Sequence, residues 1–316
     1  MTDLPLLVLV LGPTGAGKSD LALDIAERFG GEIVNCDSVQ LYRGFDIGTA
    51  KTPPSERRGI PHHLIDVLDP GEVFTAGDYS RVARPILREI EGRGRIPVVA
   101  GGTGFYVRAL LEGLFEGPGR DADLRARLGD AERRRPGFLH RALRRFDKVA
   151  AARIHPNDTN KLIRALEVSL SAEGPMTEQF KKGRDPLTGF RRVKSVLNPP
   201  REALYYKLNQ RCAGMLKAGL IEEIDHLLSQ GISADSKPFE SIGYKEALEL
   251  RAGSITREQA LELMQRHTRQ YAKRQLTWFR RELDCQWLDG FGSDEAVRSS
   301  AFKMLVKELQ ASKTGQ

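Results

Sequence analysis

The feature that most constrains this chain is a glycine-rich segment that follows its first apolar run. The run, Leu6–Leu11, has the length of a buried strand, and residues 18–29 show the apolar spacing typical of a helix. The eight residues between them match GxxxxGK[ST], the pattern of a loop whose backbone N–H groups and following helix N-terminus hold phosphate oxygens. We predict a polyphosphate site, with Lys18 as a cation for the phosphates and Ser19 as a ligand of Mg²⁺. The site is formed by Gly12, Pro13, Thr14, Gly15, Ala16, Gly17, Lys18 and Ser19.

Strands and helices alternate over the first hundred residues. Apolar runs at Ile33-Val34 and 96–100 have strand character, and residues 76–91 have helical periodicity. Short turns between them predict βαβ units, and so an α/β fold with a P-loop NTPase-like parallel sheet flanked by helices. Such sheets bind ligands at the carboxyl ends of their strands. Three polar or glycine-rich loops are expected there: residues 12–19, 37–42 and 101–106.

Two of these loops carry candidate chemistry. Asp37 follows the second strand, where a carboxylate beside a bound diphosphate needs Mg²⁺ between them or a task of its own, such as taking a proton. In the third loop, Gly101-Gly102 allow close backbone approach to a ligand, and Thr103 offers a hydroxyl at its rim. Each segment alone is also compatible with an ordinary loop in which Asp37 or Thr103 caps a helix.

A helical insertion rich in arginine follows the first hundred residues. Residues 120–164 hold 13 basic and 6 acidic residues, a local net charge equal to the +7 of the whole chain. This charge fits either a solvated pair of helices or a polyanion-binding surface. We divide the chain into a P-loop core at 1–119, a helical insertion at 120–195 and a continuation of the core at 196–316. A returning strand is expected at Val193–Leu197.

A second basic segment lies near the C-terminus. Residues 264–281 form a helical stretch without any acidic residue, in which Arg266, Arg269, Lys273 and Arg280 share one face. Tyr271, Trp278 and Phe279 are interleaved with them, and Phe279 is expected in the core. A basic face of this length, with no acid on it, fits nucleic-acid phosphates better than a merely solvated surface.

Several function classes are disfavoured. Asn160-Lys161 is followed by Leu162-Ile163 and lacks the aspartate of a guanine-reading NKxD, and no Walker-B-like strand typical of an ATPase motor is evident. The N-terminal apolar run is too short to span a bilayer and lacks the flanks of a secretory signal. Cys36, Cys212 and Cys285 are scattered and fit a reducing cytoplasm, where we expect the protein.

Seven segments together resemble one family over about residues 6–287. In order they read GPTGAGKS, DSVQLY, PHHLIDV, VVAGGTGFYVRALLEG, NKLIRALEV, IGYKE and TRQYAKRQLTWFR. Their combination resembles the bacterial tRNA dimethylallyltransferase (tRNA isopentenyltransferase) family. The resemblance implies a cytoplasmic, monomeric prenyltransferase that uses Mg²⁺. It would move a dimethylallyl group from dimethylallyl diphosphate to N6 of the adenosine 3′-adjacent to the anticodon, in a tRNA anticodon stem-loop, and release diphosphate.

The same resemblance implies roles for single residues. Asp37 matches the catalytic aspartate that takes the N6 proton, Thr103 a threonine near the reacting centre and Arg211 an arginine on the diphosphate. The P-loop then holds a prenyl diphosphate, although the pattern alone equally fits ATP-binding. Gly104 departs from relatives with a bulkier residue and predicts a looser wall there. The implied tRNA-contacting residues are Asp37, Ser38, Val39, Gln40, Thr103, Arg125, Lys161, Leu162, Ile163, Arg164, Ala165, Gly243, Tyr244, Lys245, Arg269, Lys273 and Arg274.

Two other functions remain open on the residues alone. A P-loop kinase of a nucleoside or another small metabolite would explain the loop and Asp37 but not the acid-free basic helix. A non-catalytic RNA-binding P-loop protein would explain the charge distribution but would leave Asp37 and Thr103 without a task.

Overall fold

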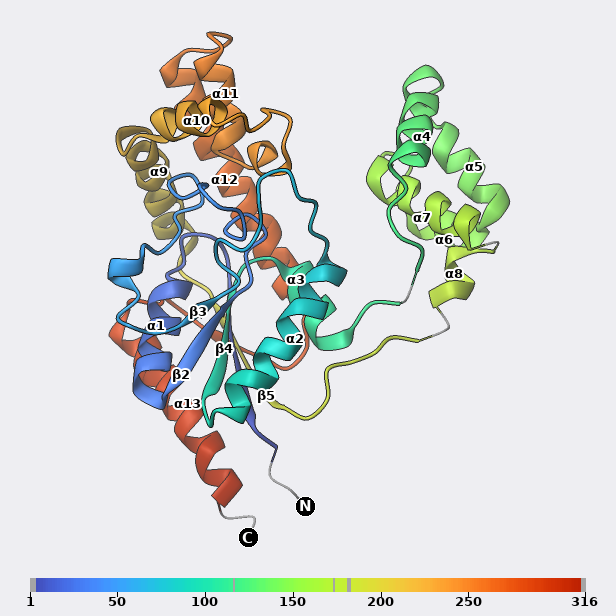
Figure 1. Ribbon diagram of the computed structural model, residues 1–316. Helices are drawn as coiled ribbons and strands as arrows, with labels where there is room; N and C mark the ends of the chain where they lie inside the picture. The colour runs from blue at the N-terminus through green and yellow to red at the C-terminus, as the bar shows by residue number, and fades with distance from the viewer. Residues whose placement is uncertain (1–3, 116, 173, 181–182, 314–316) are drawn as a thin grey trace. The chain divides into compact units, whose positions relative to one another are not determined.

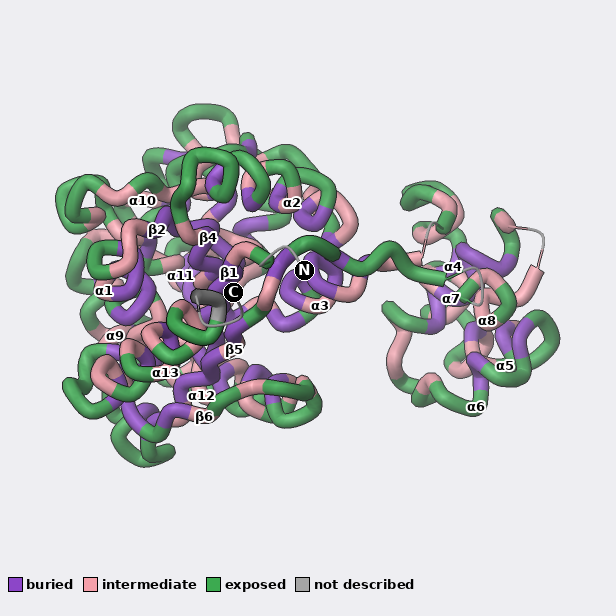
Figure 2. The backbone as a smooth tube through the Cα atoms, turned by 90° about the horizontal axis from the view of Figure 1, so that it is seen from below, coloured by how far each residue is buried: buried purple, intermediate pink, exposed green. Residues whose placement is uncertain are grey.

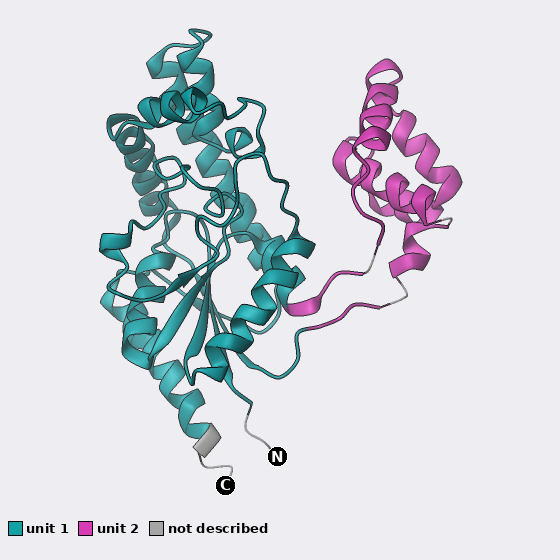
Figure 3. Ribbon diagram, viewed as in Figure 1, with its two compact units in different colours: residues 1–110, 187–316 teal, residues 111–186 magenta. Residues whose placement is uncertain are grey.

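The structure, a computed structural model, describes residues 4–115, 117–172, 174–180 and 183–313 (Figure 1). The chain divides into two compact units, residues 1–110 with 187–316, and residues 111–186 (Figure 3). None of the described helices is long and apolar enough to cross a membrane.

The larger unit is built on a six-stranded sheet in the order β3-β2-β4-β1-β5-β6, and every pairing is parallel. The predicted strands are present, and the register places Val8 of β1 beside Val98 of β4 and Val193 of β5. The predicted fold class is confirmed. The strands are β1 (Leu6–Leu11), β2 (Gly31–Asn35), β3 (His62–His63), β4 (Ile96–Gly101), β5 (Arg191–Leu197) and β6 (Cys285–Leu288).

Helices cover both faces of this sheet, whose strands β1 and β4 are among the most buried parts of the unit (Figures 1 and 2). Alternate residues of β1, among them Leu6, Val8 and Val10, pack with apolar side chains of α1 and α13 in one cluster. Helices α2 and α3 lie on the other face. The helices of this unit are α1 (Lys18–Phe29), α2 (Ala76–Gly92), α3 (Gly104–Glu112, which ends in the other unit), α9 (Arg201–Lys217), α10 (Leu220–Ser229), α11 (Tyr244–Arg251), α12 (Arg257–Phe279) and α13 (Glu295–Lys313).

The smaller unit is helical and has its own core, with Leu139, Leu143 and Leu162 fully buried. Its boundaries differ from the predicted insertion at 120–195, because the unit comprises residues 111–186. Residues 187–195 belong to the larger unit, since β5 begins at Arg191 and pairs along the whole of β1. The helices are α4 (Ala122–Arg134), α5 (Phe138–Phe146), α6 (Lys148–Arg153), α7 (Thr159–Ser171) and α8 (Met176–Gln179).

Candidate functional site

The P-loop joins the end of β1 to the start of α1. Gly12 has φ +143°, and a side chain there would place its Cβ 3.0 Å from the carbonyl oxygen of Leu197 at the end of β5. Gly15, at φ +77°, lies against the Leu208 side chain of α9. Glycine is therefore required at both positions by backbone conformation and by close neighbours. Ser19 is exposed in the first turn of α1, where a hydroxyl can reach a ligand on the loop.

Lys18 is half-buried, and its amine donates a hydrogen bond of 2.8 Å to the carbonyl oxygen of Pro13. Among the described residues, no carboxylate forms an ion pair with it. Burial lowers the pKa of Lys18 to about 8, although the negative charge of Asp37 acts in the opposite direction. The loop thus holds a partly desolvated cation that an anionic ligand would stabilise.

Asp37 and Thr103 come from neighbouring strands and are linked through backbone groups. One carboxylate oxygen of Asp37 accepts hydrogen bonds from the N–H groups of Val39 (2.9 Å) and Gln40 (3.3 Å). The Thr103 hydroxyl accepts one from the Ser38 N–H at 3.2 Å. Asp37 therefore caps a turn rather than a helix. Thr103 precedes α3, and its hydroxyl bonds across to the Asp37 loop.

Arg211 of α9 lies at the same edge of the sheet. Its guanidinium donates to the Thr14 hydroxyl at 3.4 Å and to the Thr49 carbonyl oxygen at 3.3 Å. Burial lowers its pKa, while the charge of Asp37 raises it. The structure therefore brings the P-loop, Asp37 and Thr103 together at the carboxyl ends of β1, β2 and β4, as the sequence predicts for a parallel sheet, and Arg211 of α9 lies beside the P-loop.

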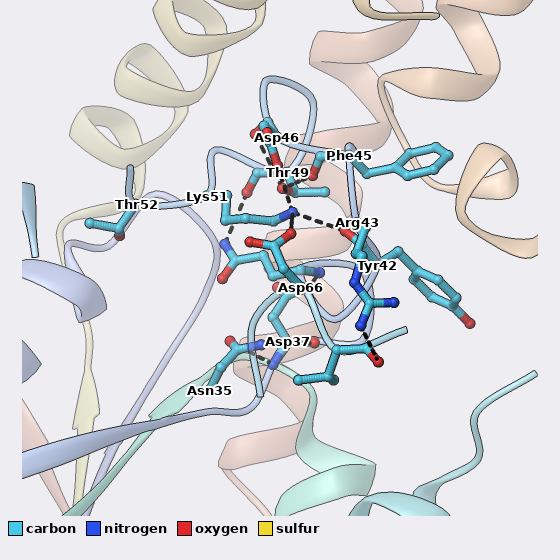
Figure 4. A network of polar contacts seen from close by, with 12 residues as sticks. Asn35, Asp37, Tyr42, Arg43, Phe45, Asp46, Thr49, Lys51, Thr52 and Asp66 are labelled. Atoms are coloured by element: carbon cyan, nitrogen blue, oxygen red, sulfur yellow. Dashed lines mark hydrogen bonds and ion pairs between the residues drawn. The ribbon is translucent and has the colours of Figure 1, made fainter. Parts of the chain in front are cut away.

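A buried lysine shapes the segment that follows Asp37 (Figure 4). The Lys51 amine, whose side chain is only 4% exposed, contacts a carboxylate oxygen of Asp46 and one of Asp66, each at 2.6 Å, and donates to the Tyr42 carbonyl oxygen at 2.9 Å. These bonds fold the loop so that the Thr49 carbonyl accepts from both Gln40 and Arg211. Lys51 is thus fully satisfied within the fold, and the sequence did not single it out.

Helix α12 supplies further residues to the site. The indole of Trp278 fills the space beside Gly104, because a Cβ at that position would lie 2.2 Å from its ring. The looser wall expected from Gly104 is therefore wrong. Tyr271 lies close to Thr103 and Asp37: burial raises its pKa, the charge of Asp37 adds to this, and a hydrogen bond with Thr103 opposes it. Neither Tyr271 nor Gln275, which contacts two of the loops, was predicted as a site residue.

The basic face of α12 is largely accessible. Arg266, Lys273, Arg274 and Arg280 are exposed, and Phe279 is buried as expected. Arg269 is half-buried and donates to the Asn209 side chain of α9 at 2.5 Å. Lys273, Arg274 and Trp278 help to line a groove of about 410 Å³ on this surface. The helix therefore presents cations outward while its other face contacts the site.

The segment before and within α11 agrees only in part with the predicted RNA contacts. Lys245 is exposed, but Tyr244 is fully buried against Phe45 and Phe239, and its hydroxyl donates to Glu223. Gly243 is also buried, with its N–H bonded to Glu246 at 2.7 Å. Only Lys245 of these three residues is available to a ligand on the surface.

The predicted tRNA contacts in the helical unit also include both buried and accessible residues. The side chains of Leu162, Ile163 and Ala165 are buried in its core, so Lys161 and Arg164 are the accessible members of that segment. Arg125 donates twice to Glu167, at 2.8 and 3.0 Å, and Arg164 donates to it at 2.6 Å. Arg125 joins α4 to this buried acid of α7, while Arg164, on α7 itself, pairs with the acid one turn away and donates to the Pro118 carbonyl oxygen, so both arginines have a structural role.

Comparison with known proteins connects this geometry to a family. A family model described as IPP transferase matches residues 40–282. The chain is 57% identical over 303 residues to the tRNA dimethylallyltransferase of Solibacter usitatus and 55% identical over 306 residues to that of Koribacter versatilis. In both cases the match covers 96% of this chain and 99% of the relative.

Solved structures agree with these relatives. The full-length tRNA isopentenylpyrophosphate transferase of Bacillus halodurans is 36% identical, with a TM-score of 0.73 and 98% of each chain covered. A eukaryotic dimethylallyltransferase acting on tRNA is 29% identical, with a TM-score of 0.80, and the match covers 95% of this chain and 78% of that one. The resemblance drawn from the sequence motifs is confirmed: the chain belongs to the IPP transferase family.

Proposed function

We propose that this protein transfers a dimethylallyl group from dimethylallyl diphosphate to N6 of the adenosine 3′-adjacent to the anticodon of certain tRNAs, and releases diphosphate. The observation that carries the proposal is the meeting of a P-loop with Asp37 and Thr103 at one edge of the sheet. There, among the described residues, neither Lys18 nor Asp37 has an ion-pair partner. The curated relatives are named for this transfer, which favours it over the kinase alternative.

The donor would bind through its diphosphate. The P-loop N–H groups, the Lys18 amine and the Arg211 guanidinium offer donors to phosphate oxygens on one side of the site. These groups also stabilise the charge that grows on the diphosphate as its bond to carbon breaks. The P-loop in this proposal serves a leaving group, and no phosphoryl transfer from ATP is required.

Mg²⁺ fits this arrangement. No group of three acids, histidines or cysteines suited to a metal is found among the described residues. Mg²⁺ at phosphate sites usually takes only one or two protein oxygens and otherwise binds substrate phosphates and water, so the exposed Ser19 hydroxyl suffices as a protein ligand. When bound, the ion would neutralise diphosphate charge.

The acceptor would approach from the Asp37 side. The N6 amine of adenine is a weak nucleophile because its lone pair is delocalised into the ring. As N6 forms its bond to the first carbon of the prenyl group, the carbon–oxygen bond to diphosphate breaks and the N6 proton passes to Asp37. The hydrogen bonds from Val39 and Gln40 engage one oxygen of Asp37, which leaves its other oxygen for this proton. Thr103 would sit beside the reacting amine.

The tRNA would contact the exposed cations of α12, and its target base would leave the stack to reach Asp37. We further propose that the helical unit holds the anticodon stem-loop through Lys161 and other exposed basic side chains. A cytoplasmic, monomeric enzyme is part of the same proposal.

The decisive experiment incubates the protein with labelled dimethylallyl diphosphate, Mg²⁺ and unmodified tRNA. We expect label in the RNA without added ATP, and inhibition by inorganic pyrophosphate competing for the P-loop. Transfer that depends absolutely on ATP, or ATP turnover with a small metabolite and no label in RNA, would instead support the kinase.

A further inference from the structure

Gln275 connects two loops of the candidate site. Its side-chain oxygen accepts a hydrogen bond of 2.8 Å from the Thr14 N–H in the P-loop. Its side-chain nitrogen donates one of 2.9 Å to the carbonyl oxygen of Gly102, the residue before Thr103. The residue is only 6% exposed, and its partners lie 261 and 173 positions away in the sequence. One amide therefore joins the loop expected to hold the donor to the loop beside the acceptor.

The surroundings are built around this amide. A Cβ on Gly102 would lie 2.2 Å from the Gln275 side-chain nitrogen, so glycine at 102 leaves the space that the amide occupies. A carboxamide offers both an acceptor and an N–H donor at its two terminal atoms without carrying a charge. Glutamate would keep the acceptor for Thr14, but it would lose the donor to Gly102.

The position of Gln275 on α12 separates it from the RNA-facing residues. Lys273 and Arg274 are exposed on the same helix, whereas Gln275 is directed to the P-loop. Tyr271 lies one turn earlier, near Thr103 and Asp37. A change at Gln275 would therefore disturb the site while leaving the basic face of the helix unaltered.

We propose that Gln275 is a positioning residue for the transfer reaction, an inference that rests on the proposed function. Its two hydrogen bonds fix the distance between the P-loop, where the diphosphate leaves, and the Gly102–Thr103 segment, where the adenine is held. Both substrates would still bind to their own loops without this link. The reacting carbon and nitrogen would then meet less often in a productive geometry, and an error of about 1 Å in such alignment costs about 10²-fold in rate.

The test compares Gln275→Met, which keeps the length of the side chain but removes both bonds, with Gln286→Met as a matched control. Gln286 is exposed on β6, which forms the edge of the sheet beyond β5. With saturating labelled donor and tRNA, we expect Gln275→Met to lower kcat about 10²-fold. The KM for tRNA and the salt dependence of tRNA binding should stay within twofold, and Gln286→Met should match the parent.

The outcomes separate this inference from the proposed function. A parent protein that transfers no label would overturn both. An active parent with an equally active Gln275→Met variant would overturn the positioning role alone. If kcat is kept at low temperature and only the midpoint of thermal unfolding falls, Gln275 is a structural residue and the inference is wrong.

A double-mutant cycle tests the contact itself. Gly102→Ala should displace the Gln275 amide and lower kcat about tenfold in the parent. In the Gln275→Ala background the 2.2 Å clash is removed and the Gly12 carbonyl oxygen, 3.2 Å from the new Cβ, is the closest remaining neighbour, so the same change should cost only about twofold. Equal effects in both backgrounds would show that the two residues act independently, which contradicts the proposal.

Discussion

The sheet edge that carries the candidate site and the helical unit differ in how their charged side chains are paired. In the helical unit, burial by itself would raise the pKa of Glu167, but hydrogen bonds from Arg125 and Arg164 lower it to about 2. At the sheet edge, the one hydrogen bond of the Lys18 amine to the described residues goes to a carbonyl oxygen, and burial lowers the pKa of Lys18 to about 8. Charges paired within the fold hold helices together, whereas charges left without a counter-ion are available to a ligand.

The comparison also holds between two lysines of the same unit. Lys51 is buried with Asp46 and Asp66, and it shapes a loop. The Lys18 amine, in contrast, has no carboxylate partner among the described residues. The difference shows that a count of basic residues is a poor guide to binding sites, because pairing decides which cations remain available.

The largest effect is expected at Asp37, an acid of the sheet edge that has no ion-pair partner among the described residues. Asp37→Ala should lower kcat by about 10²–10⁴, the usual contribution of a positioned general base, while donor and tRNA binding change little. The matched control is Asp69→Ala, since Asp69 is exposed and pairs with Arg43 on the surface. Single-turnover transfer of labelled prenyl groups measures the effect. If the transfer rate of Asp37→Ala stayed within a few-fold of the parent rate, Asp37 would not be the base.

Much of this edge could be predicted because its signals are local in the sequence. Each of the three loops follows an apolar strand and carries glycine or a polar residue where the strand ends. Adjacent parallel strands then bring residues as distant as Lys18 and Thr103 together.

Other features depend on contacts between distant segments and leave little local trace. Gln275 stands among basic residues, as a solvated side chain would, and its bonds reach across the fold. Strand β6 has only four residues, and it forms through pairing with β5 some 90 positions earlier. Tyr244 and Leu162 lie in segments that resemble RNA-contacting ones, yet packing buries both.

The next largest effect concerns the paired charges of the helical unit. Glu167→Gln should lower the free energy of unfolding of that unit by about 2–3 kcal/mol. This is less than the usual cost of about 3–5 kcal/mol for a broken buried pair, because the two arginines left behind are partly exposed and can be solvated. Asp130→Asn breaks only the exposed pair with Arg133 and should cost under about 1 kcal/mol. Denaturant unfolding compares them; equal small losses would show that the Glu167 pairing contributes little.

A pH series of donor binding tests whether the Lys18 amine, which has no counter-ion among the described residues, binds the diphosphate in its protonated form. Below pH 8 Lys18 is mostly protonated and attracts the diphosphate; above pH 8 the ligand-free protein loses this proton and must regain it on binding. The Kd of dimethylallyl diphosphate should therefore rise about tenfold between pH 7 and pH 9. Lys18→Arg keeps its charge over this range and should lack this rise. Parallel pH profiles would show that the Lys18 proton is not linked to donor binding.

The smallest effect concerns the salt dependence of tRNA binding, and it compares a basic residue of α12 with one of the helical unit. Each cation on an RNA phosphate releases counterions, so tRNA affinity falls as salt rises, and loss of one contact flattens the log–log slope by about one unit. Lys273 is exposed on α12 and has no ion-pair partner among the described residues, whereas Arg125 gives two hydrogen bonds to Glu167. Lys273→Met should therefore flatten the slope by about one unit, and Arg125→Met should leave it unchanged.

Filter binding of tRNA over a salt series, with circular dichroism to verify folding, compares both variants with the parent. If both variants flattened the slope equally, Arg125 would bind RNA despite its pairing with Glu167, and the proposed difference between the two regions would be wrong. An unchanged slope for Lys273→Met would instead make the acid-free face of α12 a solvated surface.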